Sequence, residues 1–356
     1  IMDKAFLRIS FLSALLALVV IVLGAYVRLS DAGLGCPDWP GCYGKLLAPT
    51  AATEVAAANQ AFPGQPVESP KAWKEMIHRY FASTLGLFIL ALAGIAWKQR
   101  KTLGQQVRLP LFLVLLVAFQ GALGMWTVTM LLKPAIVTLH LLGGMLTLAL
   151  LWWTMLTHWQ NKTHRDEADT RLTVSPTLRR WALLALVVVY CQIALGGWTS
   201  TNYVALHCWD LPTCQGQWLP PTDFKEGFTL WREVGVNYEG GVLSREAGTA
   251  VHLTHRIGAA ITFLVVGGLS LALFFSGSLE ARRFGALIAL ALCVQIALGL
   301  LNILLVLPIE IAVAHNGGAA ILLLSLVTVN RRIKKNLALT KSTPSSADYS
   351  SEAQLN

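Results

Sequence analysis

Charged residues are scarce in this chain of 356 residues, where Asp, Glu, Lys and Arg together make up 13%. Soluble domains carry roughly 25%, so the composition excludes an ordinary soluble enzyme. The short alternating strands of a membrane β-barrel are also missing. The hydrophobic residues, 55% of the total, instead form blocks of about 20, the length that a helix needs to cross a bilayer. The sequence therefore predicts an all-α integral membrane protein.

A nucleic-acid-binding function is excluded in the same way. The formal net charge is +9, but no basic stretch is interleaved with aromatic residues that stack on bases. The apolar run from Ile9 to Val27 is too long for a cleaved signal peptide and has no small-residue cleavage pattern, so we expect it to be the first span. Eight spans are predicted, at 7–27, 77–97, 109–130, 135–157, 181–201, 250–275, 284–306 and 310–330.

The positions of Lys and Arg predict how these spans are oriented. If the N-terminus is cytoplasmic, the segments on that side carry 18 of the 28 basic residues but 7 of the 19 acidic residues. We therefore expect both termini in the cytoplasm. The two long loops, 28–76 and 202–249, then face the periplasm or another extracytoplasmic space. The Ser-rich segment 336–356 is expected to be a disordered cytoplasmic tail.

An internal repeat organises the chain. The segment Cys36-Pro-Asp-Trp-Pro-Gly-Cys42 recurs 172 residues later as Cys208-Trp-Asp-Leu-Pro-Thr-Cys214, and Gln120-Gly-Ala-Leu-Gly124 recurs as Gln295-Ile-Ala-Leu-Gly299. Because each copy holds an even number of spans, the copies share one orientation and are related by an axis along the membrane normal. The repeat predicts two tandem, pseudo-symmetric four-helix halves, 1–160 and 181–335, joined by a cytoplasmic linker at 161–180.

Four of the eight histidines lie within predicted spans, one in each even-numbered span, in the outer third of the membrane. They are His78, His140, His255 and His315. A single histidine in a membrane commonly forms an interhelical hydrogen bond, but four at matched depths fit two bis-histidine haem sites, because haem iron takes axial ligands from opposite faces. Zinc or copper sites use three or four clustered ligands. The residues therefore favour one haem site in each half.

Arginine follows a predicted ligand in both halves, at Arg79 and Arg256. Each lies on the side of the membrane where the positive-inside rule disfavours a cation. Two explanations remain open for them. The guanidinium groups either extend to the outer lipid headgroups or pair with haem propionates, whose carboxylates suit the fork of an arginine.

The two halves differ in one residue beside the histidines. Glu75 lies three residues before His78, on the same helix face, and His252 takes its place in the second half. A carboxylate in one half predicts proton-accepting chemistry on the haem of that half. The alternative is an interfacial Glu75 paired with Lys71 or Lys74.

Four cysteines form two pairs of identical spacing in the outer loops, where disulfides are permitted. The pairs are Cys36/Cys42 and Cys208/Cys214. Each pair is either a structural staple or a dithiol that exchanges electrons with a nearby haem. His207 beside Cys208 leaves a copper site open as the disfavoured alternative. Cys191 and Cys293 fall inside spans and are interpreted as inert packing residues.

With these features the chain resembles the haem A synthase family of bacterial membranes and the mitochondrial inner membrane, over all eight spans. The motifs that carry the resemblance are Glu75-x-x-His78-Arg79, Cys36-x5-Cys42, Thr138-Leu-His140, His252-x-x-His255-Arg256 and Ala314-His315-Asn316. The resemblance implies an oxidoreductase that converts the C8 methyl group of haem O to the formyl group of haem A by successive hydroxylations, for terminal oxidase biogenesis.

The resemblance also implies roles for single residues. His78 and His140 would hold haem O as substrate, with Glu75 as the catalytic carboxylate, and His255 and His315 would hold a permanent haem b. It implies the inner (plasma) membrane of a bacterium as the location. It suggests the farnesyltransferase that makes haem O, oxidase assembly factors and a second copy of the chain as partners. Both outer loops keep their cysteines, so the redox-active pair stays unassigned. A di-haem b electron-transfer protein and a haem transporter are the competing hypotheses.

Overall fold

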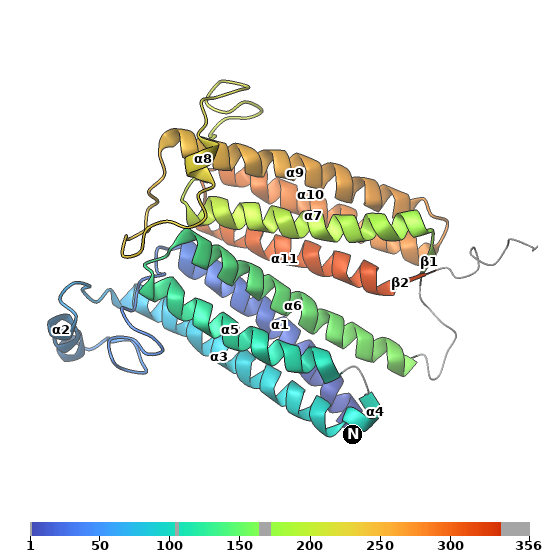
Figure 1. The fold of residues 1–356 in the computed structure, drawn as a ribbon, viewed down its shortest axis with the longest axis horizontal. Helices are drawn as coiled ribbons and strands as arrows, with labels where there is room; N and C mark the ends of the chain where they lie inside the picture. Colours follow the sequence, from blue (N-terminus) through green and yellow to red (C-terminus); the bar gives the residue numbers. More distant parts are fainter. Residues whose placement is uncertain (1, 104–106, 164–171, 336–356) are drawn as a thin grey trace, which may run out of the picture.

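The computed structural model describes residues 2–103, 107–163 and 172–335 of the chain. Within these residues, eight helices are long and apolar enough to cross a membrane, and they run alongside one another (Figure 1). They are α1 (Met2–Leu29), α3 (Ser69–Lys98), α5 (Arg108–Thr129), α6 (Pro134–Thr163), α7 (Pro176–Thr201), α9 (Arg245–Phe274), α10 (Leu279–Leu304) and α11 (Ile309–Arg332). The prediction of an all-helical membrane protein with eight spans is confirmed.

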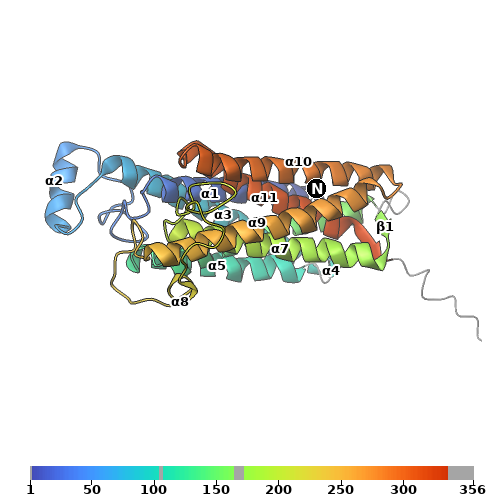
Figure 2. The ribbon, with the colours of Figure 1, turned by 90° about the horizontal axis from the view of Figure 1, so that it is seen from above.

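Several short elements were not predicted, because segments of three to ten residues carry little periodic signal. They are α2 (Ala52–Ala61), α4 (Arg100–Leu103), α8 (Phe224–Gly227), β1 (Leu172–Val174) and β2 (Ile333–Lys335). The two strands pair in parallel. Helices α2 and α8 lie at one end of the molecule, which we call the loop end, and α2 projects beyond the spanning helices (Figures 1 and 2). The beginning of α1 and the strands lie at the opposite end (Figure 1).

The spanning helices pack in two groups. Helices α1, α3, α5 and α6 pack around one another, as do α7, α9, α10 and α11, and the groups meet through α1, α6, α7 and α11. Polar bonds cross between them, since the Trp152 indole donates to Thr328 Oγ1 at 2.8 Å and the Tyr190 hydroxyl donates to the Leu142 carbonyl at 2.8 Å. Part of the predicted linker (164–171) and the whole predicted tail (336–356) lie outside the described residues.

Five of the spanning helices begin five or more residues before their predicted spans, and two of them, α3 and α9, carry residues of the candidate site. Helix α3 begins eight residues early, at Ser69, and α9 begins five residues early, at Arg245. Hydropathy falls where charged residues appear, but the helices continue, because Pro70 occupies the first turn of α3 and the Ser244 hydroxyl caps α9 by accepting from Ala247 N. As a result Glu75, predicted outside the span, belongs to the helix itself.

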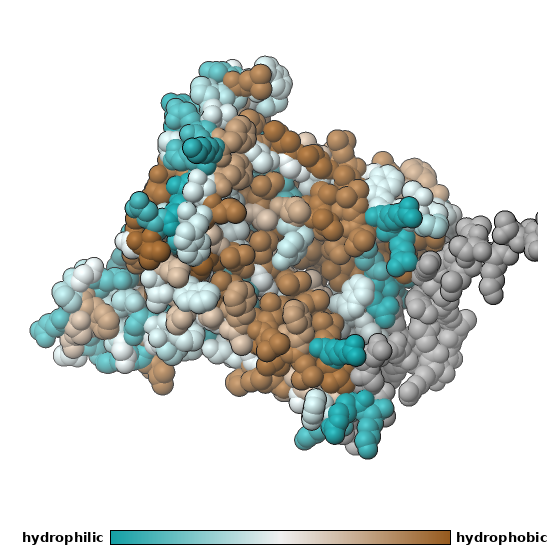
Figure 3. Space-filling model, viewed as in Figure 1, coloured by the Kyte–Doolittle hydropathy of each residue, from teal (hydrophilic) through white to brown (hydrophobic). Residues whose placement is uncertain are grey.

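The surface between the two polar ends is apolar. Hydrophobic residues cover the middle of the visible face and hydrophilic residues gather towards its ends (Figure 3). This distribution suits helices that face lipid with their backbone groups already paired. Cys191 and Cys293 are exposed on this helical surface, so the expectation that they pack inside the protein was wrong. Hydropathy places a residue within a span but does not say which side of the helix it occupies.

Candidate functional site

A cavity of about 510 Å³ opens within the first helix group, a volume within the range of cofactor pockets. His78 and His140 both line it, together with Glu75 and Arg79. The second helix group closes one side of the cavity with Gly197, Ser200 and Thr201 from α7 and Asn316 from α11. The structure therefore brings the predicted residues of the first half together, in a cavity to which both halves contribute.

Each of the four predicted histidines packs against a glycine of a neighbouring helix. A Cβ atom added at these glycines would lie 2.9–3.5 Å from the Cε1 atom of the imidazole, so a larger residue would crowd the ring at three of them and would just touch it at Gly124. The pairs are Gly24 with His78, Gly124 with His140, Gly196 with His255, and Gly299 with His315. Gly124 and Gly299 belong to the repeated segments found in the sequence. The sequence alone did not indicate that these glycines make room for the histidine rings.

The imidazoles carry unused hydrogen-bonding capacity. The Nδ1 atoms of His78, His140 and His315 are buried without a close hydrogen-bond partner, and each ring interacts with one backbone carbonyl, that of Val20, Gln120 and Gln295 respectively. His255 lies within electrostatic range of His315, and its Nδ1 is 3.0 Å from Gln192 Nε2. Buried nitrogens without a partner are costly and fit rings that bind a metal through one nitrogen and are oriented through the other. The donor set therefore fits a haem in each half.

Glutamine recurs beside three of these histidines. Gln120, Gln192 and Gln295 each precede by four residues the glycine that faces the ring, and each packs over another glycine three residues after the histidine. The sequence signal was the repeated Gln-x-x-x-Gly, whose function was not recognised. His78 is the exception, because Val20 and Phe81 occupy the corresponding positions. The surroundings of this histidine therefore differ from those of the other three.

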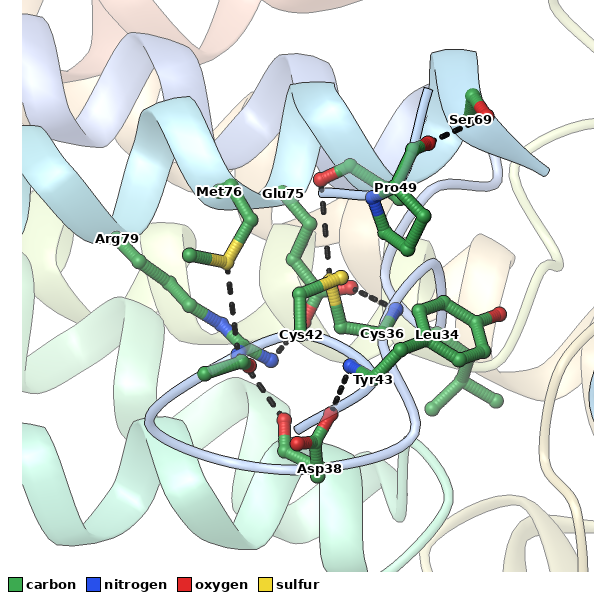
Figure 4. The surroundings of a disulfide bond; sticks show 12 residues. Leu34, Cys36, Asp38, Cys42, Tyr43, Pro49, Ser69, Glu75, Met76 and Arg79 are labelled. Carbon is green, nitrogen blue, oxygen red and sulfur yellow. Dashed lines mark hydrogen bonds and ion pairs between the residues drawn. A yellow bond between two sulfur atoms is a disulfide. The ribbon is translucent and has the colours of Figure 1, made fainter. Parts of the chain in front are cut away.

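Glu75 is buried, with 5% of its surface exposed, and its carboxylate has two partners (Figure 4). Oε1 pairs with Arg79 Nη2 at 2.5 Å, and Oε2 accepts a hydrogen bond from Cys36 N at 2.9 Å. Lys71 instead pairs with Glu68, and the Lys74 ammonium lies 5.1 Å from the Tyr26 ring centroid. The alternative of a surface ion pair between Glu75 and one of these lysines was therefore wrong.

The arginines that follow the histidines hold the disulfide loops. Besides Glu75, Arg79 donates to the carbonyl groups of Asp38, Pro40 and Gly41 (Figure 4). Arg256 donates to the corresponding loop of the second half, to Thr213 O at 2.8 Å and Cys208 O at 2.5 Å. The sequence suggested lipid headgroups or haem propionates as the partners of these two arginines. In the structure both guanidinium groups donate to protein carbonyl groups instead.

Both outer cysteine pairs form disulfides in loops of the same construction. Cys36 bonds Cys42, and Cys208 bonds Cys214. Inside each loop an aspartate accepts two backbone N–H groups just after the second cysteine, Asp38 from Tyr43 and Gly44, and Asp210 from Gln215 and Gly216. The shared pattern Cys-x-Asp-x-Pro-x-Cys-x-Gly was visible in the sequence, but the role of its aspartate was missed.

The charge of Asp210 is set by this network. Desolvation raises the pKa of its carboxyl group, but hydrogen bonds from the Thr213 hydroxyl and from the backbone N–H groups of Gly216 and Gln215 outweigh desolvation and bring the pKa to about 2. The contribution of Asp210 to loop stability is therefore complete above the ordinary carboxyl pKa of roughly 4 and is lost as the pH falls through about 2. Asp210 is therefore ionised, and it holds the loop through its hydrogen bonds, at any physiological pH.

His252 and Glu75 occupy the same place in the two halves. His252 Nδ1 accepts a hydrogen bond from Cys208 N at 3.0 Å, as Glu75 Oε2 does from Cys36 N. The two side chains therefore hold their disulfide loops in the same way. They differ in chemistry, because only Glu75 places a carboxyl group at the site.

The sequence left a copper site at His207 and Cys208 open as an alternative. Cys208 is in a disulfide and offers no thiolate, and the His207 ring packs against Gly248. Within residues 2–103, 107–163 and 172–335, no three His, Cys, Asp or Glu side chains gather as a metal site.

Comparisons with known proteins match nearly the whole chain. A family model described as cytochrome oxidase assembly protein matches residues 7–327. A protein named "Heme A synthase" from Shewanella oneidensis is 47% identical over 313 residues, which cover 88% of this chain and 92% of that protein. Proteins of the same name from Allorhizobium ampelinum and Caulobacter sp. are 30% and 26% identical, over 90% and 91% of this chain and 88% and 95% of their own lengths.

Proposed function

The chain belongs to the family of cytochrome oxidase assembly proteins that includes the haem A synthases, and on this premise we propose that it oxidises the C8 methyl group of haem O to the formyl group of haem A. One observation carries the assignment of the reaction to the first half. The cavity lined by His78 and His140 also contains the buried carboxylate of Glu75, whereas the second half has His252 at the equivalent position.

In this proposal His78 and His140 bind the substrate haem, and Gly24 and Gly124 leave room for their rings. Glu75 accepts protons as the methyl group is oxidised. Arg79 offsets the charge of that carboxylate. Hydrogen bonds from Cys36 N and from Arg79 hold the Glu75 side chain in one position. A fixed carboxylate at the wall of an apolar cavity is suited to take a proton from a hydrophobic substrate.

The second half binds a permanent haem b through His255 and His315. Such a haem supplies an acceptor for the electrons that leave the substrate. Helix α11 carries both His315 and Asn316, and Asn316 lines the substrate cavity. One helix therefore contacts both proposed sites, which keeps the distance between them short.

The substrate cavity opens towards the surface that faces lipid. Ser83 and Leu90 on α3 and Ala118 on α5 line the cavity and are also exposed. Haem O carries a farnesyl chain, so an entrance between these helices would let an apolar substrate arrive from the bilayer. We place the loop end in the periplasm and both termini in the cytoplasm, following the distribution of basic residues.

Pigment analysis tests the proposed function. The protein is expressed with a source of haem O, purified and extracted with acid, and the haems are identified by chromatography and mass. Haem A or hydroxylated haem O beside haem B is the expected result. Haem B alone, with haem O present and electron acceptors restored, would contradict the proposal and favour a di-haem electron-transfer protein. That alternative rests on the presence of a pair of histidines, each packed against a glycine, in both halves.

A bulky residue at the lipid opening is expected to hinder the substrate. Gly121 lines the cavity on α5, and nothing lies within 4 Å of a Cβ added there. Gly121→Leu should therefore raise KM for haem O about tenfold, the effect of roughly 1.4 kcal/mol, without loss of haem b. The matched control is Gly94→Leu on α3, which also has open space but does not line the cavity. Equal KM values in both variants would argue against this entrance.

The two disulfides are expected to differ in their effect on activity. Replacing either pair by serine should lower the free energy of unfolding by about 2 kcal/mol, because both loops are short and equal in length. Loss of the Cys36–Cys42 bond should also lower haem A formation, because it loosens the loop whose backbone N–H at position 36 holds Glu75. Thermal unfolding and haem A yield per folded protein are the measurements. Equal activity of the two double variants would show that both disulfides have a structural role only.

A further inference from the structure

Arg28 is a cation in the substrate cavity that the sequence analysis did not single out. It lies in the last turn of α1 and lines the cavity with His78 and His140. Gly24, which makes room for the His78 ring, precedes it by four residues. Residues four apart share one face of a helix, so Arg28 lies on the same side of α1, about 6 Å nearer the loop end.

The guanidinium group of Arg28 is oriented but keeps donors to spare. Its Nη2 donates to Ser200 O at 2.6 Å, and its Cζ lies 3.7 Å from the Tyr203 ring centroid. Asp31 and Glu239 act on it electrostatically, yet within the described part of the chain no carboxylate forms an ion pair with it and Nε and Nη1 form no hydrogen bond. A partly buried guanidinium without an anionic partner is costly.

Arg79 lines the same cavity, but its guanidinium group already has an anionic partner. Its guanidinium is paired with Glu75 and bonded to three carbonyl groups of the disulfide loop. It would have to release the loop or the carboxylate to bind another anion. Of the two arginines in the cavity wall, Arg28 is the one without a carboxylate partner in the described part of the chain.

The repeat gives Arg28 no counterpart. The residue 172 positions later is Ser200, whose own carbonyl accepts the hydrogen bond from Arg28. The cation is therefore present in the half that carries Glu75 and absent from the equivalent position of the other half. Like Glu75, it marks the first-half cavity as different.

We propose that Arg28 binds a propionate carboxylate of the porphyrin substrate in the first-half cavity, and so turns the carboxylate edge of the porphyrin towards the loop end. The inference rests on the proposed function, because it takes the occupant of the cavity to be haem O. Tyr203 fixes the plane of the guanidinium, Ser200 fixes one of its edges, and the remaining fork matches a carboxylate. Arg28 thereby sets the orientation of the methyl group relative to Glu75.

A comparison of haem O with its dimethyl ester tests this assignment. The ester keeps the ring, the iron and the farnesyl chain but has no carboxylates. Wild-type protein should show a KM for the free acid about ten- to hundredfold lower than for the ester, as expected for hydrogen bonds to a charged group. Arg28→Gln should raise KM for the free acid to the value for the ester and leave KM for the ester unchanged. Arg28→Lys should recover part of the preference.

A control variant separates this local role from a general effect of charge. Lys74→Gln removes a cation near α1 that does not line the cavity, and it should keep the full preference for the free acid. If Arg28→Gln weakens acid and ester equally, Arg28 only joins α1 to α7, and the assignment is overturned. The assignment is also overturned if Arg28→Gln keeps the preference for the free acid over the ester. A wild-type protein that forms no haem A from either substrate refutes the proposed function instead, a result distinguishable from both.

Discussion

Glu75→Gln is expected to lower haem A formation by about 10²–10⁴-fold, the range typical of a lost general base, while haem b stays bound and haem O accumulates. Glutamine keeps the size of the side chain and an oxygen that accepts from Cys36 N, but it cannot take up a proton. The carboxylate is buried beside the substrate cavity, and water does not easily replace it. The measurement is the ratio of haem A to haem O in acid extracts of purified protein.

The structure supplies a sharper control than alanine for this test. Glu75→Ala would leave both Cys36 N and Arg79 without their partner, so a loss of activity would not separate chemistry from loop structure. Glu75→His introduces the residue that holds the equivalent loop in the second half, where His252 accepts from Cys208 N. We expect this variant to keep the hydrogen bond with Cys36 N and to lose the ion pair with Arg79, so its thermal stability should fall less than that of Glu75→Ala. A near-normal rate with Glu75→Gln would refute the carboxylate as the proton acceptor.

His255→Ala and His315→Ala are each expected to remove most of the haem b from the purified protein. Each replacement removes a proposed haem ligand and its contact with Gly196 or Gly299, so the proposed site would lose both an iron-binding nitrogen and the packing of the ring. The bound haem B per protein, from acid extraction, should fall from one to a small fraction. The reduced absorption spectrum should lose the signature of a six-coordinate bis-histidine haem.

Thr254→Ala is the matched control for the second-half ligands. Thr254 neighbours His255 on α9, and its hydroxyl bonds the carbonyl of Ala250 in its own helix. The variant should keep both the haem content and the spectrum. Full haem B content with an unchanged spectrum in both histidine variants would show that the permanent haem is bound elsewhere, and the di-haem arrangement would fall with it.

Much of the fold and part of the site follow from the sequence. Hydropathy fixes the number of spans, because each must present about 20 apolar residues to lipid whatever its neighbours are. The repeat makes the histidines and the cysteine pairs recognisable as matched sets. Span ends were less well predicted, because helix α3 continues past Lys71 and Lys74, where hydropathy falls but hydrogen bonding does not.

The partners of the charged residues were decided by tertiary structure alone. Arg79 was considered for lipid or propionate, and the structure gives it Glu75 and the disulfide loop. Arg28 drew no attention, because its neighbour Ser200 is 172 residues away and lies close only when α1 and α7 pack together. Local patterns record which residues share a helix face, and the repeat records which are equivalent. The contacts of a buried guanidinium depend on which helices meet, and this is set by the packing of both halves around one cavity.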